Sequence, residues 1–202
     1  SGKTHWHVNR FFSSTKSDSI SFTSAHNLYI DENGICYIFG AGGYENPSDG
    51  VILLDVENNP KNPIYLGEWN NYYLHDGMVR GDTLWAAAIN EGKFFVIDVR
   101  KKSNPTTIAS HNTPFNFTHN VWISDNGNYL YTTDEKSDAF ITVYNVRDLN
   151  NIEEVYRIQS NPGSGSVPHN TLVDGNFLIT SYYRDGTTVH DITHPDNIVQ
   201  VA

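Results

Sequence analysis

The chain has 202 residues, enough for a sizeable buried core in one or two domains. Aromatic residues make up 13% and charged residues only 18%, a mix that favours strands joined by tight turns. The net charge of −10, with 13 Lys and Arg residues, argues against a nucleic-acid partner, because phosphates need a basic surface. No apolar run approaches the roughly 18 residues that span a bilayer, so no transmembrane segment is predicted.

A His-Asn or His-Asp dipeptide opens four successive units along the chain. The histidines are separated by 49, 44 and 50 residues. A fixed period of this length is the signature of a repeat architecture. The four dipeptides are His26-Asn27, His75-Asp76, His119-Asn120 and His169-Asn170.

Each dipeptide leads into a predicted β-hairpin. A short apolar run comes first, at 28–30, 78–79, 121–123 and 171–173. A turn with glycine follows, which favours a hairpin because Gly accepts a positive φ. The second strands are predicted at 35–39, 83–89, 129–133 and 176–182, which are rich in aromatic and β-branched residues.

Third strands are predicted at 50–56, 94–99, 141–146 and 187–192. The next-to-last residue of each is Asp55, Asp98, Asn145 or Asp191, spaced by 43, 47 and 46 residues, which confirms the period independently of the histidines. Fourth strands follow, for example at 64–69 and 153–159. Four strands in about 46 residues are typical of a β-propeller blade.

The sequence therefore predicts an all-β β-propeller with four consecutive four-stranded blades, at about 26–74, 75–118, 119–168 and 169–202, within a single domain or fragment spanning 1–202. A β-sandwich is the alternative all-β fold, although its strands do not repeat in register. We expect the blades to be part of a larger ring. A closed four-bladed ring would instead require residues 4–24 to pair with the fourth blade.

Two groups of residues resemble a known family. The third strand and its turn, at 51–63 above all, resemble the LVIVD repeat of bacterial and archaeal surface propellers. The segments 118–122, 132–135 and 181–186, with His169-Asn170, resemble the choice-of-anchor B proteins, in order over about residues 26–202. The resemblance implies a propeller longer than this chain and an extracellular or cell-surface location.

A site is predicted at one mouth of the propeller channel. The first strand of a blade lines the channel, and the second runs antiparallel to it, so the start of one and the end of the other lie together. This places the four histidines near Glu135. Imidazole nitrogens with a carboxylate suit a divalent transition ion better than Mg²⁺ or Ca²⁺. The predicted metal ligands are His26, His75, His119, His169 and Glu135.

Other roles for the histidines stay open. One alternative is that they have a structural role and form hydrogen bonds to the turn aspartates; another is that they are acid–base catalysts. The turn aspartates are Asp31, Asp82, Asp125 and Asp174. The remaining histidines, His111, His190 and His194, are predicted to lie at the surface, and His5-Trp6-His7 is interpreted as incidental.

Positions that break the repeat are candidates for ligand binding. Only the third unit ends its second strand with a carboxylate pair, and only the fourth ends it with an arginine. A solvated loop explains such charges equally well. Asp76, which directly follows the second histidine, is a further candidate. The predicted ligand-binding residues are therefore Asp76, Asp134, Tyr182 and Arg184.

These observations favour a binding module over an enzyme. The expected function is an exported propeller that holds a divalent metal ion or a small polar ligand at the channel mouth, with other surface proteins as further partners. The alternatives are a hydrolase-like metalloenzyme with Glu135 as general base, and a purely structural interaction propeller.

Overall fold

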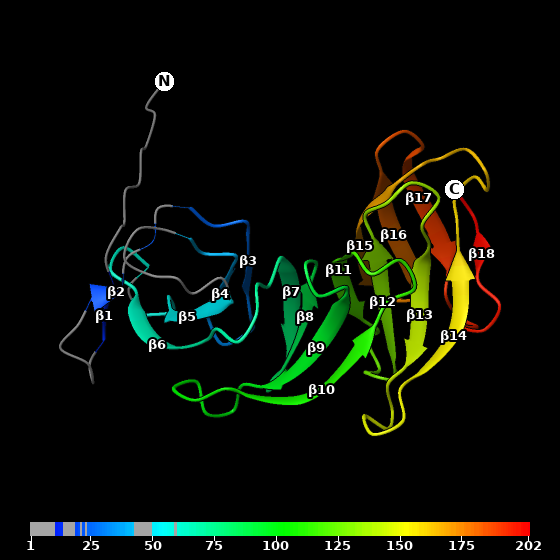
Figure 1. Cartoon of the computed structure of the whole chain (residues 1–202). Coiled ribbons are helices and arrows are strands. Elements are labelled where there is room, and N and C mark those ends of the chain that lie inside the picture. Colours follow the sequence, from blue (N-terminus) through cyan, green and yellow to red (C-terminus); the bar gives the residue numbers. More distant parts are fainter. Residues whose placement is uncertain (1–10, 14–18, 21, 23, 43–49, 59) are drawn as a thin grey trace.

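The structure is a computed structural model that describes residues 11–13, 19–20, 22, 24–42, 50–58 and 60–202. Regular structure in these residues consists of strands, without a helix. They form four consecutive antiparallel sheets arranged in an arc (Figure 1). This confirms the predicted all-β class and the four blades.

The strands follow the predicted order closely. Blade 1 contains β3 (Asn27–Ile30), β4 (Ile35–Phe39), β5 (Val51–Asp55) and β6 (Ile64–Trp69). Blade 2 contains β7 (Asp76–Arg80), β8 (Thr83–Ala88), β9 (Lys93–Asp98) and β10 (Thr106–Asn112). Blade 3 contains β11 (Thr118–Ile123), β12 (Tyr129–Asp134), β13 (Ile141–Asn145) and β14 (Glu153–Ile158). Blade 4 contains β15 (Pro168–Asp174), β16 (Phe177–Tyr182), β17 (Gly186–Asp191) and β18 (Val199–Gln200).

Blade 1 carries two additional strands at its outer edge. β1 (Phe11–Ser13) pairs in parallel with β6, and β2 (Ser19–Ile20) pairs with β1. The described strands of the first 24 residues therefore extend blade 1 and do not join blade 4. Blades 1 and 4 lie at opposite ends of the arc (Figure 1).

The first two strands of each blade are joined by a tight turn that contains a glycine. Each of these glycines has a φ in the left-handed region, between +56° and +72°, where other residues are strained. They are Gly34, Gly81, Gly127 and Gly175.

The hydrophobic core lies between neighbouring blades. Phe39 and Leu53 of blade 1 pack with Leu84 and Ile97 of blade 2 in one buried cluster. Equivalent clusters join blades 2 and 3, and blades 3 and 4. Each blade is thus buried against its neighbours, as expected when sheets stack around an axis.

A belt of polar side chains joins the inner strands. The inner strands β3, β7, β11 and β15 contact one another in this order. Asp76 is 3% exposed, and its carboxylate accepts hydrogen bonds from the amides of Asn27 (2.7 Å) and Asn120 (2.8 Å). The side-chain Oδ1 of Asn120 accepts a hydrogen bond from the backbone N–H of Thr171 (2.9 Å). This polar belt fixes the blades in register directly behind the histidines.

Among the described residues, no helix has the length and apolar character needed to cross a membrane.

Candidate metal centre at the channel mouth

Each of the four histidines lies at the start of an inner strand. His26 and His75 come directly before β3 and β7. His119 and His169 lie at register shifts near the start of β11 and β15. Such bulges turn a side chain away from the regular pleat, which is one local reason for the orientation of these two rings.

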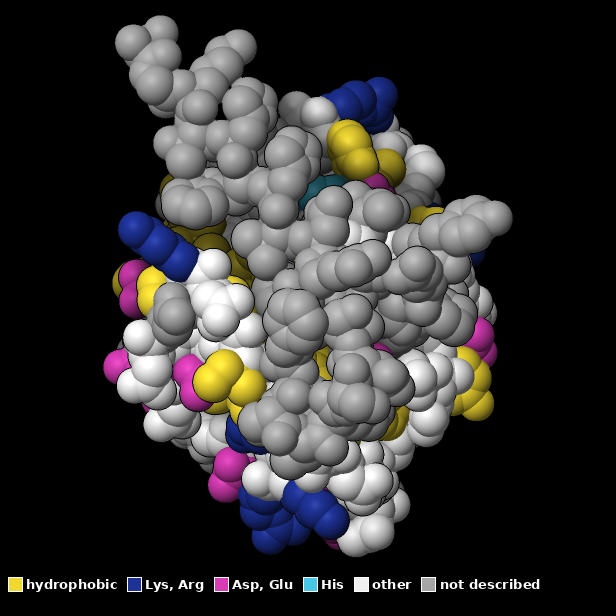
Figure 2. Space-filling model, turned by 90° about the vertical axis from the view of Figure 1, so that its left-hand side faces the viewer, with side chains coloured by type: hydrophobic (Ala, Val, Ile, Leu, Met, Phe, Trp, Pro, Cys, Tyr) yellow, Lys and Arg dark blue, Asp and Glu magenta, His cyan; other side chains and the backbone are white. Residues whose placement is uncertain are grey.

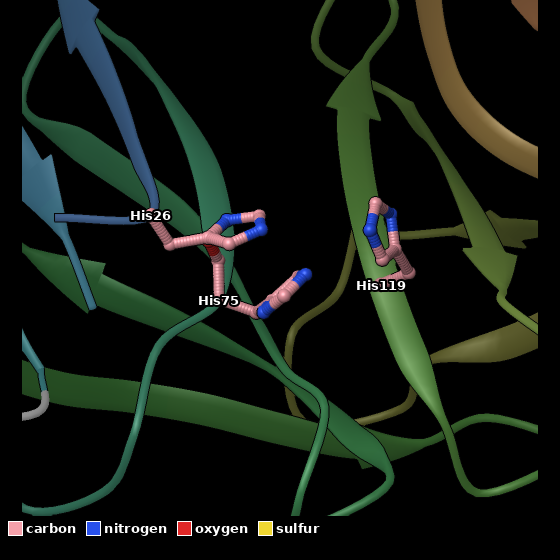
Figure 3. A group of neighbouring side chains, drawn as sticks. All are labelled: His26, His75 and His119. Atoms are coloured by element: carbon pink, nitrogen blue, oxygen red, sulfur yellow. The ribbon is translucent and has the colours of Figure 1, made fainter.

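The imidazole rings form a continuous row across the four blades. The ring centroids are 3.6 Å apart for His26 and His75, 4.5 Å for His75 and His119, and 4.3 Å for His119 and His169. Figure 3 shows the side chains of His26 and His75 lying side by side, from the starts of two neighbouring blades, on the side that faces His119. In Figure 2, part of a histidine side chain is visible beside an acidic side chain.

Two overlapping groups of ligand atoms result. One nitrogen each from His26, His75 and His119 lie within 4.8 Å of one another, and so do ligand atoms of His119, Glu135 and His169. The four histidines therefore form two groups that share His119, and not one group around a single point.

Glu135 bridges the second group. Its Oε2 is 3.6 Å from Nε2 of His119, and its Oε1 is 3.9 Å from Nε2 of His169. The Tyr183 hydroxyl donates a hydrogen bond to Oε1. The backbone N–H of Glu135 donates a hydrogen bond to the Phe117 carbonyl (3.2 Å), which fixes the chain just after β12. Tyr183 therefore orients the carboxylate towards the two imidazoles.

Contacts behind the rings orient the first group. Nδ1 of His26 lies 2.8 Å from the backbone carbonyl of His75, so in the neutral ring this nitrogen carries the proton and Nε2 has the free lone pair. The Tyr73 hydroxyl is 3.1 Å from Nδ1 of His75. Nδ1 of His119 is buried without a hydrogen-bond partner.

Burial keeps two of these imidazoles neutral. Desolvation, together with the neighbouring His26, lowers the pKa of His75 to about 4. Desolvation also lowers the pKa of His119 to about 4, against the opposing effect of the Glu135 carboxylate. Neutral imidazole is the form that coordinates metal ions, so both rings are ready to act as ligands at pH 7.

The turn aspartates do not serve as partners of the histidines. Asp31 accepts bonds from the N–H groups of Asn33 and Ile35, both at 2.9 Å. Asp125 pairs with Arg80 at 3.2 Å. The reason is topological, because these turns follow the inner strands and so lie at the end opposite to the histidines.

The predicted ligand-binding residues have structural contacts in this structure. Asp76 belongs to the polar belt. Asp134 is fully buried, and its carboxylate accepts bonds from Thr113 Oγ1 (2.6 Å) and the Phe117 N–H (2.8 Å), which orders the loop before β11. Tyr182 is buried in the core between blades 3 and 4. Arg184 donates to the backbone carbonyl of Ser164. These contacts favour structural roles for all four.

The surface prediction is wrong for one of the remaining histidines. His190 is fully buried on β17, and both of its ring nitrogens lack hydrogen-bond partners. His111 packs against Phe94 and Tyr144, whereas His194 is exposed. His5-Trp6-His7 lies outside the described residues.

Sequence reasoning assigned no role to two tyrosines of the site, Tyr73 and Tyr183. Tyr183 follows β16 at the same end of the blade as the histidines, so its position was a usable signal. Tyr73 precedes His75 by two residues, and nothing in its residue type marks it as a partner of the ring.

Neither a family model nor a curated protein matches this sequence. The resemblance to LVIVD and choice-of-anchor B proteins therefore stays a prediction.

Solved structures of β-propellers are similar in fold. A candidate 6-phosphogluconolactonase from Bacteroides fragilis matches with a TM-score of 0.67 and 13% identity, over 92% of this chain and 59% of the other. The Swd1 β-propeller domain of Myceliophteria thermophila matches with a TM-score of 0.64 and 13% identity, over 91% of this chain and 61% of the other. The periplasmic gluconolactonase of Pseudomonas aeruginosa matches with a TM-score of 0.61 and 13% identity, over 87% of this chain and 55% of the other.

These likenesses establish the propeller fold alone, because the sequences are so different. The chain spans only 55–61% of the length of these three structures.

Proposed function

We propose that this β-propeller binds a divalent transition metal ion at its channel mouth. The observation that supports it best is the group formed by His119, Glu135 and His169, whose ligand atoms lie within 4.8 Å of one another. Two imidazoles and one carboxylate are a common ligand set for zinc and for other first-row ions.

The ligand atoms of this group lie somewhat farther apart than those around a bound metal ion, so the site would close on binding. Ligand atoms of a tetrahedral ion with bonds of about 2.1 Å are about 3.4 Å apart. The carboxylate oxygens of Glu135 lie 3.6 Å and 3.9 Å from the two histidine nitrogens. The Glu135 side chain is one-fifth exposed, so its carboxylate has room to move towards an ion held by the two imidazoles.

A hydrolase-like metalloenzyme is the second candidate. The observation that favours it is the separation of the two groups: His26, His75 and His119 supply three nitrogens, and Glu135 lies just beyond His119. Three protein ligands leave a fourth position for water, as in catalytic zinc sites, and Glu135 would accept a proton from that water. Turnover by the metal-loaded protein would separate this candidate from simple binding.

An exported or cell-surface location is part of the same proposal. It is supported by the resemblance of the third strands and their turns to surface propellers. Fractionation of cells that produce the full-length protein would test it, with recovery of the protein in the cytosolic fraction alone as the contradicting result.

Metal titration of chelator-treated protein tests the proposed function. The experiment uses a His5→Ala/His7→Ala background, so that the N-terminal histidines do not contribute. Calorimetry with Zn²⁺ should show about one equivalent bound per chain. His169→Ala and Glu135→Gln should weaken binding at least tenfold, whereas the exposed control His194→Ala should not.

The purely structural alternative predicts a different outcome. In that case Zn²⁺ would not bind with a defined stoichiometry, or the His169→Ala and Glu135→Gln variants would bind it as the control does. Urea unfolding of each variant, followed by circular dichroism, shows whether a loss of binding reflects a loss of fold.

A further inference from the structure

A second candidate site lies beside the polar belt, further along the inner strands than the histidines. It is a pocket of about 280 Å³ to which the inner strands of all four blades contribute. Its walls also include β16 and β17 of blade 4. The residues that matter for its chemistry are Asn27, Tyr29, Asn120, Trp122, Asn170 and Thr187.

The pocket has no free charge. Asp76 is the only ionisable acid or base among its lining residues apart from the Tyr29 phenol. Both Asp76 oxygens already accept hydrogen bonds, from Asn27 and Asn120. No arginine or lysine is among the described residues that line the pocket, so a phosphate or carboxylate would bind here without a counter-charge, which is costly. The ligand that fits is therefore uncharged.

Two buried polar atoms of the lining residues have no hydrogen-bond partner. They are the acceptor Oδ1 of Asn170 and the donor Nε1 of Trp122. Buried polar groups are nearly always paired, so an unpaired acceptor and an unpaired donor on two residues that line the same pocket favour a ligand that supplies the missing partners. A hydroxyl both donates and accepts, and can satisfy either atom.

Apolar surface completes the pocket. The rings of Tyr29 and Trp122 meet edge to face, with centroids 6.2 Å apart. Leu28 and Leu172 line the same pocket and are 58% and 40% exposed. Aromatic and aliphatic walls with a few uncharged polar groups suit a molecule that has hydroxyls on its edge and C–H groups on its face.

We infer that this pocket binds a small, uncharged, polyhydroxylated molecule, of the size of a monosaccharide or cyclic polyol. The volume supports this size, because pockets for larger drug-like ligands occupy about 300–1,000 Å³. The site is separate from the metal-binding residues, since none of the four histidines lines it.

Ligand-detected NMR tests the inference on protein treated with a chelator, so that its outcome does not depend on metal. The neutral probes are D-glucose, D-galactose, D-mannose and myo-inositol, and the charged probe is glucose 6-phosphate. We expect saturation transfer to at least one neutral probe, with a Kd of about 1 mM or below, and weaker binding of the charged one.

Pocket variants locate the binding. Asn170→Ala and Trp122→Ala should each weaken the neutral probe at least fivefold. Thr187→Val, at an exposed position of the wall, keeps the test valid if either buried variant fails to fold. The matched control Asn161→Ala, in an exposed loop, should bind as the wild type does. Absence of saturation transfer to all four neutral probes, tighter binding of glucose 6-phosphate, or equal binding by the folded pocket variants would overturn the inference.

Discussion

The imidazole rings of His26 and His75 stack across the boundary between blades 1 and 2, with centroids 3.6 Å apart and planes inclined by 30°. Nδ1 of His26 is also 2.8 Å from the His75 backbone carbonyl, so a hydrogen bond holds the two residues together in addition to the contact between their rings. Two positive charges at this separation would repel strongly. The row of imidazoles therefore requires that its inner members stay neutral.

Acid should destabilise the metal-free protein through these rings. The folded-state pKa of His75 and of His119 is lowered to about 4, whereas an unfolded histidine titrates near 6.5. Between these values the unfolded state binds more protons, so stability is present above pH 6.5 and is lost as the pH falls towards 4. Urea midpoints measured at pH 7, 6, 5 and 4 should decrease across this window.

A histidine variant tests the origin of that decrease. His75→Gln should flatten the decline between pH 6.5 and 4, and the exposed His194→Gln should leave it as in the wild type. Carboxylates with a lowered pKa, such as Asp98 at about 2, lose their contribution to stability below this pH range and so do not affect the comparison. An equal pH dependence of His75→Gln and wild type would contradict the prediction.

Asp76 should be important for stability and not for ligand recognition. Asp76→Ala leaves the amide groups of Asn27 and Asn120 without their acceptor at the junction of three blades. The cost of such unpaired buried groups is about 1–3 kcal/mol, to be measured by urea unfolding. Asp76→Asn keeps one acceptor and should lose less. The exposed Asp196→Ala should change stability by less than about 0.5 kcal/mol, and a similar value for Asp76→Ala would refute the role of the polar belt.

The fold was predictable from the sequence because its signals are local and repeated. The glycine turns and the Asp55, Asp98, Asn145 and Asp191 positions recur with the blade period, and β4 and β6 begin and end where predicted. The added strands β1 and β2 were not predictable in this way, because they lie outside the repeat.

The arrangement of the site was only partly predictable. Shared position in the blade places the four histidines and Glu135 together, whereas the division into two groups depends on bulges and ring rotations that no sequence pattern encodes. Asp134 illustrates the limit. It neighbours Glu135 in sequence, but alternation along the strand sends its side chain into the loop at Thr113.

Tyr183 should contribute to metal affinity without being a ligand. Its hydroxyl holds one oxygen of Glu135, which leaves the other near His119. Groups that orient a ligand in this way typically change affinity 10- to 100-fold. Tyr183→Phe should therefore weaken Zn²⁺ binding about tenfold in calorimetry, with the fold intact. Tyr72→Phe, at another exposed tyrosine, is the control, and equal affinity of the two variants would show that Tyr183 does not position the carboxylate.

At the opposite end of the inner strands, an ion pair links the turns of blades 2 and 3, and a hydrogen bond links the turns of blades 3 and 4. The Arg80 guanidinium is 3.2 Å from Asp125 Oδ1 and also donates to the Ser124 carbonyl, while Asp125 Oδ2 accepts a bond from the Gly175 N–H at 3.2 Å. Both charged side chains are more than a third exposed, so solvent screens their attraction.

A double-mutant cycle separates this ion pair from the bonds around it. Arg80→Ala and Asp125→Ala should show a coupling energy below about 1 kcal/mol in urea unfolding, decreasing further in 1 M salt, because exposed pairs contribute little. Arg80→Ala alone should cost more than the coupling energy, since it also removes the bond to the Ser124 carbonyl. A coupling above about 2 kcal/mol that does not respond to salt would mean that the turns are joined by a desolvated pair, contrary to this account.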